Sequence, residues 1–152
     1  RTAFPWDEIS VYAPFWDQVH LYPLLNGEKK DLEMPDHVKV HKDLIAPTIS
    51  RISPKLLIDN ASLVLKLFWA DLRIHRSPMK FLRNVKLYLG EVSALLEIAQ
   101  RLEKLIKEKG WDKRKDVQYY SYWFDQQAFI LSLLKKKKLI SGFISRAHGF
   151  DV

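Results

Sequence analysis

Hydrophobic positions in the second part of the chain, from about residue 54 onward, recur every three or four residues, the spacing of one helix face. A first helix is predicted over residues 54–75. From Leu56 to Ile74, 13 of 19 residues are apolar, whereas a single core-facing stripe would need about eight. This helix therefore carries a surplus of roughly five apolar side chains, which must face a second element or solvent.

A second helix is marked at both ends. Ser77 can cap it, and Pro78 suits its first turn, where a missing N–H costs nothing. Lys107 and Lys109 suit the negative helix end, and Gly110 follows as a terminator. The apolar stripe between these ends is Leu82, Val85, Leu89, Val92, Leu96, Ala99, Leu102 and Ile106. The pattern predicts a helix of about 30 residues.

A third helix is predicted to begin after Asp112 or Asp116 and to end in the lysine run 135–138. It also holds more apolar and aromatic side chains than one stripe can bury: Tyr119, Tyr120, Tyr122, Trp123, Phe124, Phe129, Ile130, Leu131, Leu133 and Leu134. A short fourth helix is expected over residues 139–147. Alternation with a period of two is limited to short pieces such as Val38–Val40.

Residues 1–54 differ in composition. They hold six of the seven prolines, which prevent long helices. Large rings are interleaved with the prolines, and free linkers lack such rings. We expect an extended arm packed on the helical body, although its rings could instead serve a partner. The fold class is thus predicted as all-α: an up-and-down helical bundle of about four or five helices over residues 55–148, with a Pro- and aromatic-rich N-terminal arm over residues 1–54, in a single domain 1–152.

The chain has 152 residues, a net charge of +7 and no cysteine. A positive balance favours acidic partners: nucleic acid, an anionic membrane or an acidic glycoprotein. The lack of cysteine excludes disulfides and thiolate metal sites. No apolar run is long enough to span a bilayer. Because the first residue is Arg1, we expect a processed form from which any targeting segment has been removed.

The sequence contains no pattern typical of catalysis or cofactor binding. It has no Gly-rich phosphate loop and no serine in a nucleophile elbow. His37 and His41 are four residues apart, as in a metal pair, but Pro35 and Pro47 bracket them and no glutamate lies between them. Asn60 begins a glycosylation sequon inside the first helix, where we expect it to be unused. We predict a non-enzymatic protein with no metal and no cofactor.

The candidate contact residues are basic positions and large rings. The basic positions are Arg73, Arg76, Lys80, Arg83, Lys135, Lys136, Lys137 and Lys138. The candidate exposed apolar residues are Phe68, Trp69, Trp123 and Phe129. A lone charge run is usually a solvated helix end, but these cations could also contact phosphate or sulfate. No zinc-finger, RNP or helix-turn-helix pattern accompanies them, so we do not expect nucleic acid as a partner.

The stretch Leu72-Arg73-Ile74-His75, followed by Leu87-Tyr88, resembles the abalone sperm acrosomal protein family, which contains lysin and a fusagenic paralogue. Phe129 through Leu134, the lysine run and Leu139-Ile140 are similar to that family in character. The resemblance covers roughly residues 56–148 and is carried by the order and spacing of the elements.

The resemblance implies a secreted helical bundle from the sperm acrosomal vesicle, without cofactors, that acts at the egg surface. Lysin opens the egg vitelline envelope without hydrolysis, and its paralogue acts at gamete membranes. A charge of +7 is modest beside lysin, and the apolar surplus suits a bilayer. We therefore expect the fusagenic role, with egg plasma membrane lipids or an egg-surface glycoprotein as partner. Two alternatives stay open: stoichiometric dissolution of the egg vitelline envelope, and a generic basic helical interaction module. The oligomeric state is open too, a weak homodimer included.

Magnitudes favour apolar insertion over charge. One exposed Trp or Phe buries about 150–250 Å², which at ~25 cal/mol/Å² gives an upper bound of about 4–6 kcal/mol. A lysine near an anionic surface adds about 1 kcal/mol, and sea water, which the resemblance implies, shortens the Debye length to about 4 Å. We expect basic ends to dock on the egg surface, and rings such as Trp69, Trp123 and Phe129 to disturb the bilayer.

Overall fold

The computed structural model describes residues 11, 13–23, 35–41, 44, 52–74, 78–121 and 126–145, and only the backbone of residues 74, 78, 80 and 81. These residues are mostly helical, with a few short strands, which agrees with the helical class. Contacts divide the chain into two units, Arg1–Ala46 and Pro47–Val152. The expected single domain 1–152, with an arm over residues 1–54 packed on the body, stays a prediction.

The first unit contains a parallel strand pair. Its elements are η1 (Ala13–Phe15), β1 (Val19–Leu21) and β2 (Val38–Val40). Val19 of β1 lies opposite Val38 of β2, so β2 coincides with the short piece of sequence that alternates with a period of two. Ala13 and Val38 are buried, whereas Phe15 is 79% exposed. This ring of the expected arm therefore contributes little to packing.

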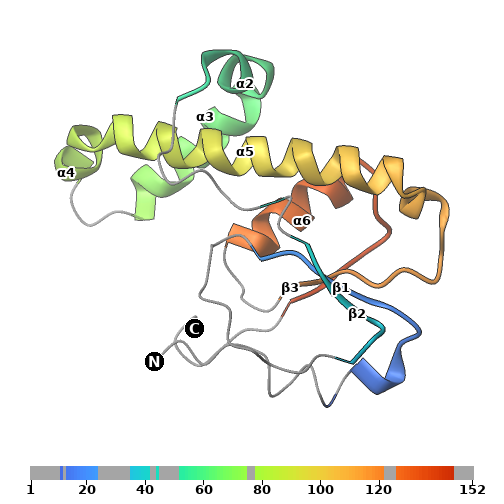
Figure 1. Ribbon diagram of the computed structural model, residues 1–152. Coiled ribbons are helices and arrows are strands. Elements are labelled where there is room, and N and C mark those ends of the chain that lie inside the picture. Colours follow the sequence, from blue (N-terminus) through green and yellow to red (C-terminus); the bar gives the residue numbers. More distant parts are fainter. Residues whose placement is uncertain are drawn as a thin grey trace. The chain divides into compact units, whose positions relative to one another are not determined.

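The second unit is built around one long helix. Its elements are α2 (Pro54–Asp59), α3 (Ala61–Ile74), α4 (Pro78–Arg83), α5 (Val85–Glu108), η2 (Trp111–Lys113), β3 (Tyr120–Ser121), α6 (Gln126–Lys136) and β4 (Ile144–Ser145). The helices α2, α4 and α6 all contact α5, and Figure 1 shows α2 and α6 on opposite sides of it. The helix α5 is thus the scaffold on which the shorter helices are held.

The predicted first helix is two helices, because the chain breaks at Asn60. The side-chain amide of Asn60 donates a hydrogen bond of 2.9 Å to the carbonyl of Leu56. Asparagine favours such local bonds over continued helix. The start at Pro54 agrees with the prediction, since proline is tolerated in the first turn. The prediction of one unbroken helix over residues 54–75 was wrong.

The predicted second helix is also interrupted, at Asn84. Its backbone, with φ −101° and ψ 12°, lies outside the helical region, and its side chain makes no cap bond. The helix α5 then continues to Glu108, and Gly110 follows in the left-handed conformation at φ 66°. The termination predicted from Gly110 is confirmed. Ser77, the expected cap, lies outside the described residues.

The predicted third helix begins later than expected. Residues 114–119 are not helical, and Tyr120 pairs in parallel with Ile144 across β3 and β4. The Asp116 carboxylate, which could have capped a helix, forms an ion pair with Arg114 instead. The helix α6 starts at Gln126, so the predicted start after Asp112 or Asp116 was wrong.

The predicted fourth helix is absent from the described residues that follow α6. Lys138 adopts φ 59°, a left-handed conformation that ends α6 and redirects the chain. Ile140 is then buried at 5% exposure, and Ile144–Ser145 forms β4. Over the described residues 139–145, strand pairing with Tyr120 is found where the helix 139–147 was expected.

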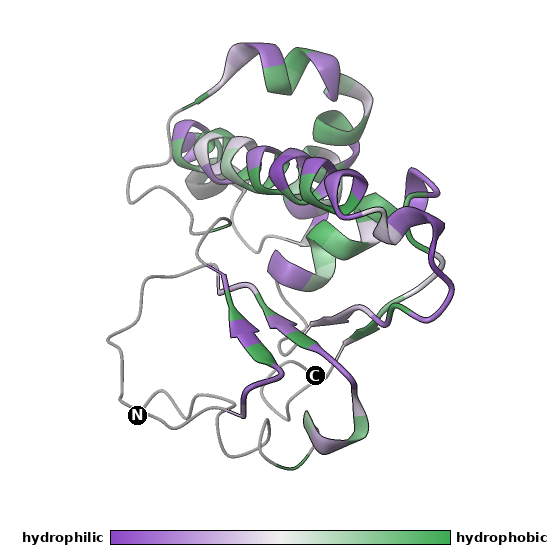
Figure 2. Cartoon of the chain, turned by 45° about the vertical axis from the view of Figure 1, so that its right-hand side comes forward, coloured by the Kyte–Doolittle hydropathy of each residue, from purple (hydrophilic) through white to green (hydrophobic). Residues whose placement is uncertain are grey.

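Two hydrophobic clusters lie along α5. The first is Val64, Val92 and Leu96, with Leu56, Leu57, Leu63, Tyr88, Leu89 and Leu133 packed against it. The second is Ile106, Leu131, Leu134 and Ile140, with Leu102, Trp111, Tyr119, Leu139 and Phe143 around it. Figure 2 shows α5 and α6 coloured hydrophobic where they face each other. The helices α2 and α3 thus cover the N-terminal half of α5, while α6 and the segment after it cover the C-terminal half.

Candidate functional site

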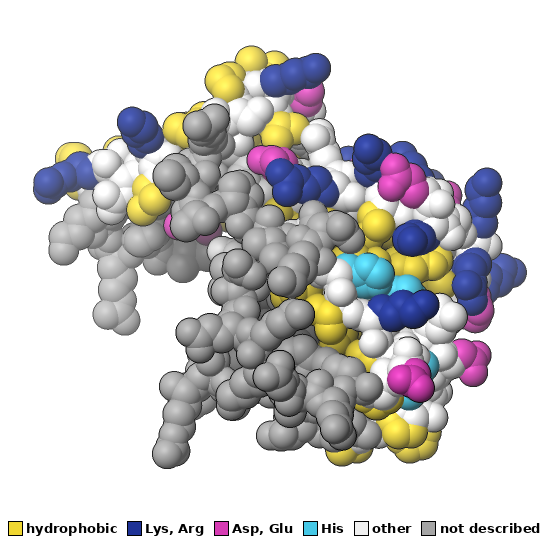
Figure 3. Space-filling model, viewed as in Figure 1, with side chains coloured by type: hydrophobic (Ala, Val, Ile, Leu, Met, Phe, Trp, Pro, Cys, Tyr) yellow, Lys and Arg dark blue, Asp and Glu magenta, His cyan; other side chains and the backbone are white. Residues whose placement is uncertain are grey.

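Large apolar side chains gather on the outside of the helices around the N-terminal half of α5. We call this set the apolar face: Ile58, Leu65, Trp69, Met79, Leu82 and Leu87. All are between 46% and 73% exposed. Figure 3 shows hydrophobic side chains interleaved with basic ones over α2 and α4. Scattered single apolar residues need no explanation, but several large ones exposed on neighbouring helices make these helices a candidate interaction surface.

The helix α3 is apolar on two sides, which produces part of this face. Val64 is 9% exposed and belongs to the first cluster, while Phe68, four residues on, lies edge-to-face with Tyr88 of α5 at 6.1 Å. Leu65 and Trp69, one position further round the helix, are 58% and 56% exposed. Residues four apart share a helix face. The surplus predicted for the first helix is therefore present as an outward stripe.

Of the four rings expected to be exposed, Trp69 is exposed and two are not. Phe68 is half-buried because it packs on Tyr88. Phe129 is half-buried as well, although the buried residues of α6, Ala128, Ile130, Leu131 and Leu134, lie on another side of the helix. Exposure of Phe68 and Phe129 was thus a wrong expectation, and Trp123 lies outside the described residues.

The sequence did not identify three of these apolar residues as exposed. Leu82 belonged to the stripe predicted to face the core, yet it is 46% exposed because the break at Asn84 separates α4 from α5. Met79 and Leu87 are 70% and 63% exposed. The spacing of apolar residues could not reveal this, because spacing assumes an unbroken helix.

The phenol of Tyr88 lies beneath this face. Burial, and then the nearby Asp71 carboxylate, holds the pKa of Tyr88 far above its ordinary value. The phenol therefore stays neutral throughout the physiological range. It serves as a packed ring rather than as an acid–base group.

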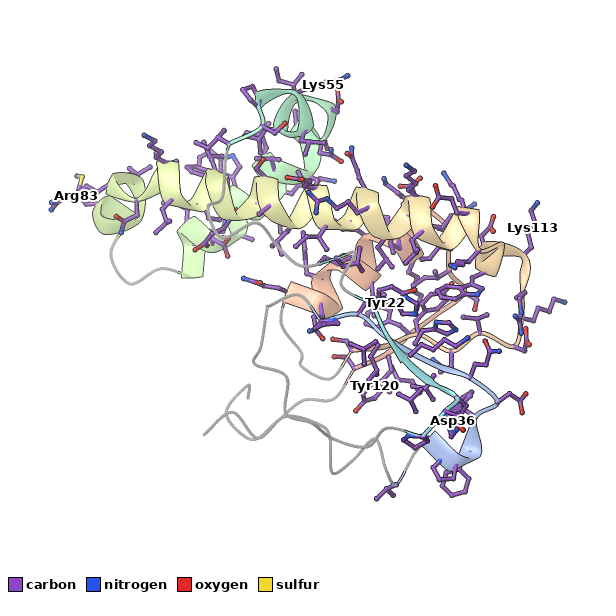
Figure 4. All side chains as sticks on the ribbon, in the orientation of Figure 1. Tyr22, Asp36, Lys55, Arg83, Lys113 and Tyr120 are labelled. Atoms are coloured by element: carbon purple, nitrogen blue, oxygen red, sulfur yellow. The ribbon has the colours of Figure 1, made fainter. Side chains whose placement is uncertain are left out.

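Cations surround the apolar face. Arg73 and Arg83 are exposed, as are Lys55, Lys66 and Lys86. Figure 4 shows Arg83 pointing outward at one end of the helical unit and Lys113 pointing outward at the other. Arg76 and the side chain of Lys80 lie outside the described residues. Basic groups next to exposed apolar ones are the combination that binds anionic interfaces.

The lysines of the run at the end of α6 differ in their contacts. Lys137 forms a 2.7 Å ion pair with Glu103 of α5, which also pairs with Lys107 at 2.7 Å. The hydrogen bonds from Lys107 and Lys137 lower the pKa of Glu103. Lys137 therefore joins α6 to α5. Lys135, Lys136 and Lys138 are exposed and have no ion pair among the described residues.

A depression of about 400 Å³ lies beside this run. It is lined by Asp112, Lys135, Lys138, Leu139, Ile140 and Ser141. Burial against the second cluster, and then the charge of Asp112, raises the pKa of Tyr119. The apolar face and this depression lie at opposite ends of α5, whose 24 residues span about 36 Å.

In the first unit, two histidines lie together that the sequence did not predict to meet. His20 Nδ1 and His41 Nε2 are 2.8 Å apart, and the ring of Tyr22 stacks on His41 at 4.7 Å. His37 does not join His41; its Nε2 donates to the carbonyl of Ala13 at 3.0 Å. The metal pair considered from the spacing of His37 and His41 is therefore not formed. The described residues hold no group of three or more potential metal ligands.

No family model, no curated protein and no solved structure matches this chain. Among the described residues, no helix is both long enough and apolar enough to cross a bilayer. The candidate site thus consists of two surfaces on one helical unit. One is an amphipathic end rich in exposed apolar residues, and the other is a charged end whose exposed Lys135, Lys136 and Lys138 have no ion pair in the part of the chain that is described.

Proposed function

We propose that this chain is a non-enzymatic binding protein that associates with lipid bilayers. More particularly, we propose a secreted sperm acrosomal protein of the fusagenic kind, acting on egg plasma membrane lipids. The observation that carries the proposal is the apolar face, which leaves several large side chains in water on one end of the second unit. The resemblance of residues 72–88 and 129–140 to the abalone sperm family supports the particular role.

The energetics support insertion of this end. Transfer of a large ring from water is worth up to about 4–6 kcal/mol, and Trp69, at 56% exposure, can gain roughly half of that. Each nearby lysine or arginine adds about 1 kcal/mol at an anionic surface. Membrane binding by a bundle of this kind therefore needs only a few inserted side chains.

Part of the expected architecture belongs to the proposal as well. It comprises a single up-and-down bundle with the N-terminal arm packed on its body. The packing of α2, α3 and α6 along α5 supports the bundle, because these helices share the two hydrophobic clusters.

The test measures binding to, and dye leakage from, vesicles of phosphatidylcholine and phosphatidylglycerol, with no protein receptor present. Trp69→Ser is expected to weaken vesicle binding by about tenfold or more, and Leu65→Ser by somewhat less. Ile144→Ser is the matched control, since Ile144 is equally exposed, at 53%, but lies at the other end of the unit.

A charge-reversed variant at Lys135, Lys136 and Lys138 tests docking by the basic end and leaves the Lys137 ion pair intact. If this variant and Trp69→Ser both release dye like the unmodified protein, the proposed membrane activity is wrong. Binding to envelope glycoprotein without any leakage would favour the lysin-like alternative.

A further inference from the structure

The end of α6 is a left-handed cap built with lysine in place of glycine. The backbone N–H of Leu139 donates to the carbonyl of Leu134 at 3.0 Å, and that of Lys138 donates to the carbonyl of Lys135 at 2.9 Å. This pair of bonds defines a Schellman motif whose left-handed residue is Lys138, at φ 59°. Glycine is the residue that adopts this conformation without strain. A lysine here costs stability, and such strain is typical of functional positions.

The side chains around Lys138 suggest what that position does. Lys138 and Lys135 both line the depression at the end of α6, and no ion pair involves either of them in the described ranges. Lys137, between them, is already bound to Glu103. Lys135, Lys138 and Ser141 therefore line one concave surface, and their ammonium and hydroxyl groups are donors suited to a tetrahedral oxyanion.

Two features make this depression a poor site for a simple anion. Asp112 contributes a carboxylate to its lining. The depression also lies at the C-terminal end of α6, where the helix dipole places partial negative charge. Both features disfavour an isolated phosphate and favour a ligand that carries a positive group next to its negative one.

We propose that the depression binds a phosphoethanolamine headgroup of a membrane phospholipid. The phosphodiester oxygens accept hydrogen bonds from Lys135, Lys138 and Ser141, and the headgroup ammonium lies toward Asp112 and the carbonyl end of α6. Ile140, buried at 5% exposure, lines the apolar part. The choice of a lipid as the source of this group rests on the proposed function.

The test is a titration of the full chain with glycerophosphoethanolamine, in which the NMR chemical shifts of the backbone amides of Lys138 and Ser141 report binding. Lys138→Gly is expected to weaken binding about fivefold, the equivalent of one lysine contact. The same change is expected to raise the thermal midpoint, because glycine relieves the left-handed strain. Loss of binding in a more stable protein cannot be attributed to unfolding. Lys136→Gln is the matched control, since Lys136 belongs to the same run but does not line the depression.

Asp112→Asn tests recognition of the ammonium group. We expect it to weaken binding of glycerophosphoethanolamine and to strengthen binding of glycerophosphoglycerol, which carries the phosphate without the amine. An unchanged ratio of the two affinities would overturn the proposal. So would an equal loss in Lys136→Gln and Lys138→Gly, because that result describes diffuse attraction to a basic surface.

The outcome is separable from that of the leakage experiment. Vesicles that lack phosphatidylethanolamine measure bilayer binding and leakage without recognition of this headgroup, and the soluble headgroup measures the depression alone. Headgroup binding without leakage would retain the inference as a binding site and remove the fusagenic proposal. Leakage without headgroup binding would retain the fusagenic proposal and overturn the inference of a headgroup site.

Discussion

Individual residues in this protein differ in role even where the sequence presents them as equivalent. The run 135–138 consists of four lysines. Lys137 joins two helices through its ion pair, whereas Lys138 lies in a strained turn. Phe68 and Trp69 are adjacent rings, yet one packs on Tyr88 and the other faces solvent. Roles of this kind depend on which neighbour a side chain meets.

Glu103 provides a prediction at the residue scale. Its pKa is lowered, first by the hydrogen bond from Lys107 and then by that from Lys137. A carboxyl whose pKa is lower in the folded state stabilises the fold at any pH above its ordinary pKa of 4.5. This contribution is lost as the pH falls through the pKa of the folded state. Glu103→Gln should therefore lower the free energy of unfolding at neutral pH by about 0.5–1 kcal/mol. Urea unfolding across acidic and neutral pH measures this.

The difference between Glu103→Gln and the unmodified protein should vanish at acid pH, where both side chains are uncharged. Glu108→Gln is the control, because the ion pair that Glu108 forms among the described residues is the 3.7 Å contact with exposed Lys104. A difference that persists unchanged below the folded pKa would contradict the ion-pair explanation.

At the scale of elements, helices are present in the three longer regions where the sequence predicts them but differ in continuity or start, and the predicted fourth helix is absent from the described residues after α6. The helix α5 and its end at Gly110 follow from apolar spacing and glycine. The breaks at Asn60 and Asn84 do not, since a single asparagine leaves the spacing intact on both sides. The start of the third helix was predicted too early because the aromatic residues 119 and 120 extend the helical pattern. In the structure residue 120 lies in the short strand β3 and residue 119 comes directly before it.

The two breaks provide a matched pair of substitutions. Asn84 is exposed and makes no cap bond with its side chain. Asn84→Ala should therefore stabilise the protein by about 0.5 kcal/mol, through higher helix propensity. The amide of Asn60 is bonded to the carbonyl of Leu56. Asn60→Ala loses a bond worth about 1 kcal/mol, and a net loss of stability is expected.

Thermal unfolding followed by circular dichroism compares the two variants. Opposite signs are the expected result. An equal effect at Asn60 and Asn84 would show that the side-chain bond at Asn60 has no part in the break.

For the molecule as a whole, the second unit combines an apolar face with a charged depression at the other end of α5. These two surfaces should respond differently to salt. Screening shortens the Debye length from about 10 Å at 0.1 M to about 3 Å at 1 M, whereas apolar insertion is insensitive to screening.

Vesicle binding is expected to fall with salt to a plateau that is set by the apolar face. Trp69→Ser should lower the plateau, and charge reversal at Lys135, Lys136 and Lys138 should flatten the salt dependence above it. Co-sedimentation with vesicles at increasing salt measures both quantities. If binding of the unmodified protein disappears at 1 M salt, insertion does not contribute and the apolar face has another partner.

The sequence by itself determined the helical class, the position of α5, the terminator at Gly110 and the excess of apolar residues on the first helix. These features are local, since periodicity and backbone preference act within a few turns of the chain. The tertiary structure decided which apolar side chains are exposed, which lysine is bound to Glu103, that His20 lies beside His41, and that Lys138 borders a depression with Asp112. Each of these depends on segments distant in sequence coming together, and a pattern along one chain cannot specify which surface of a two-faced helix meets a neighbour.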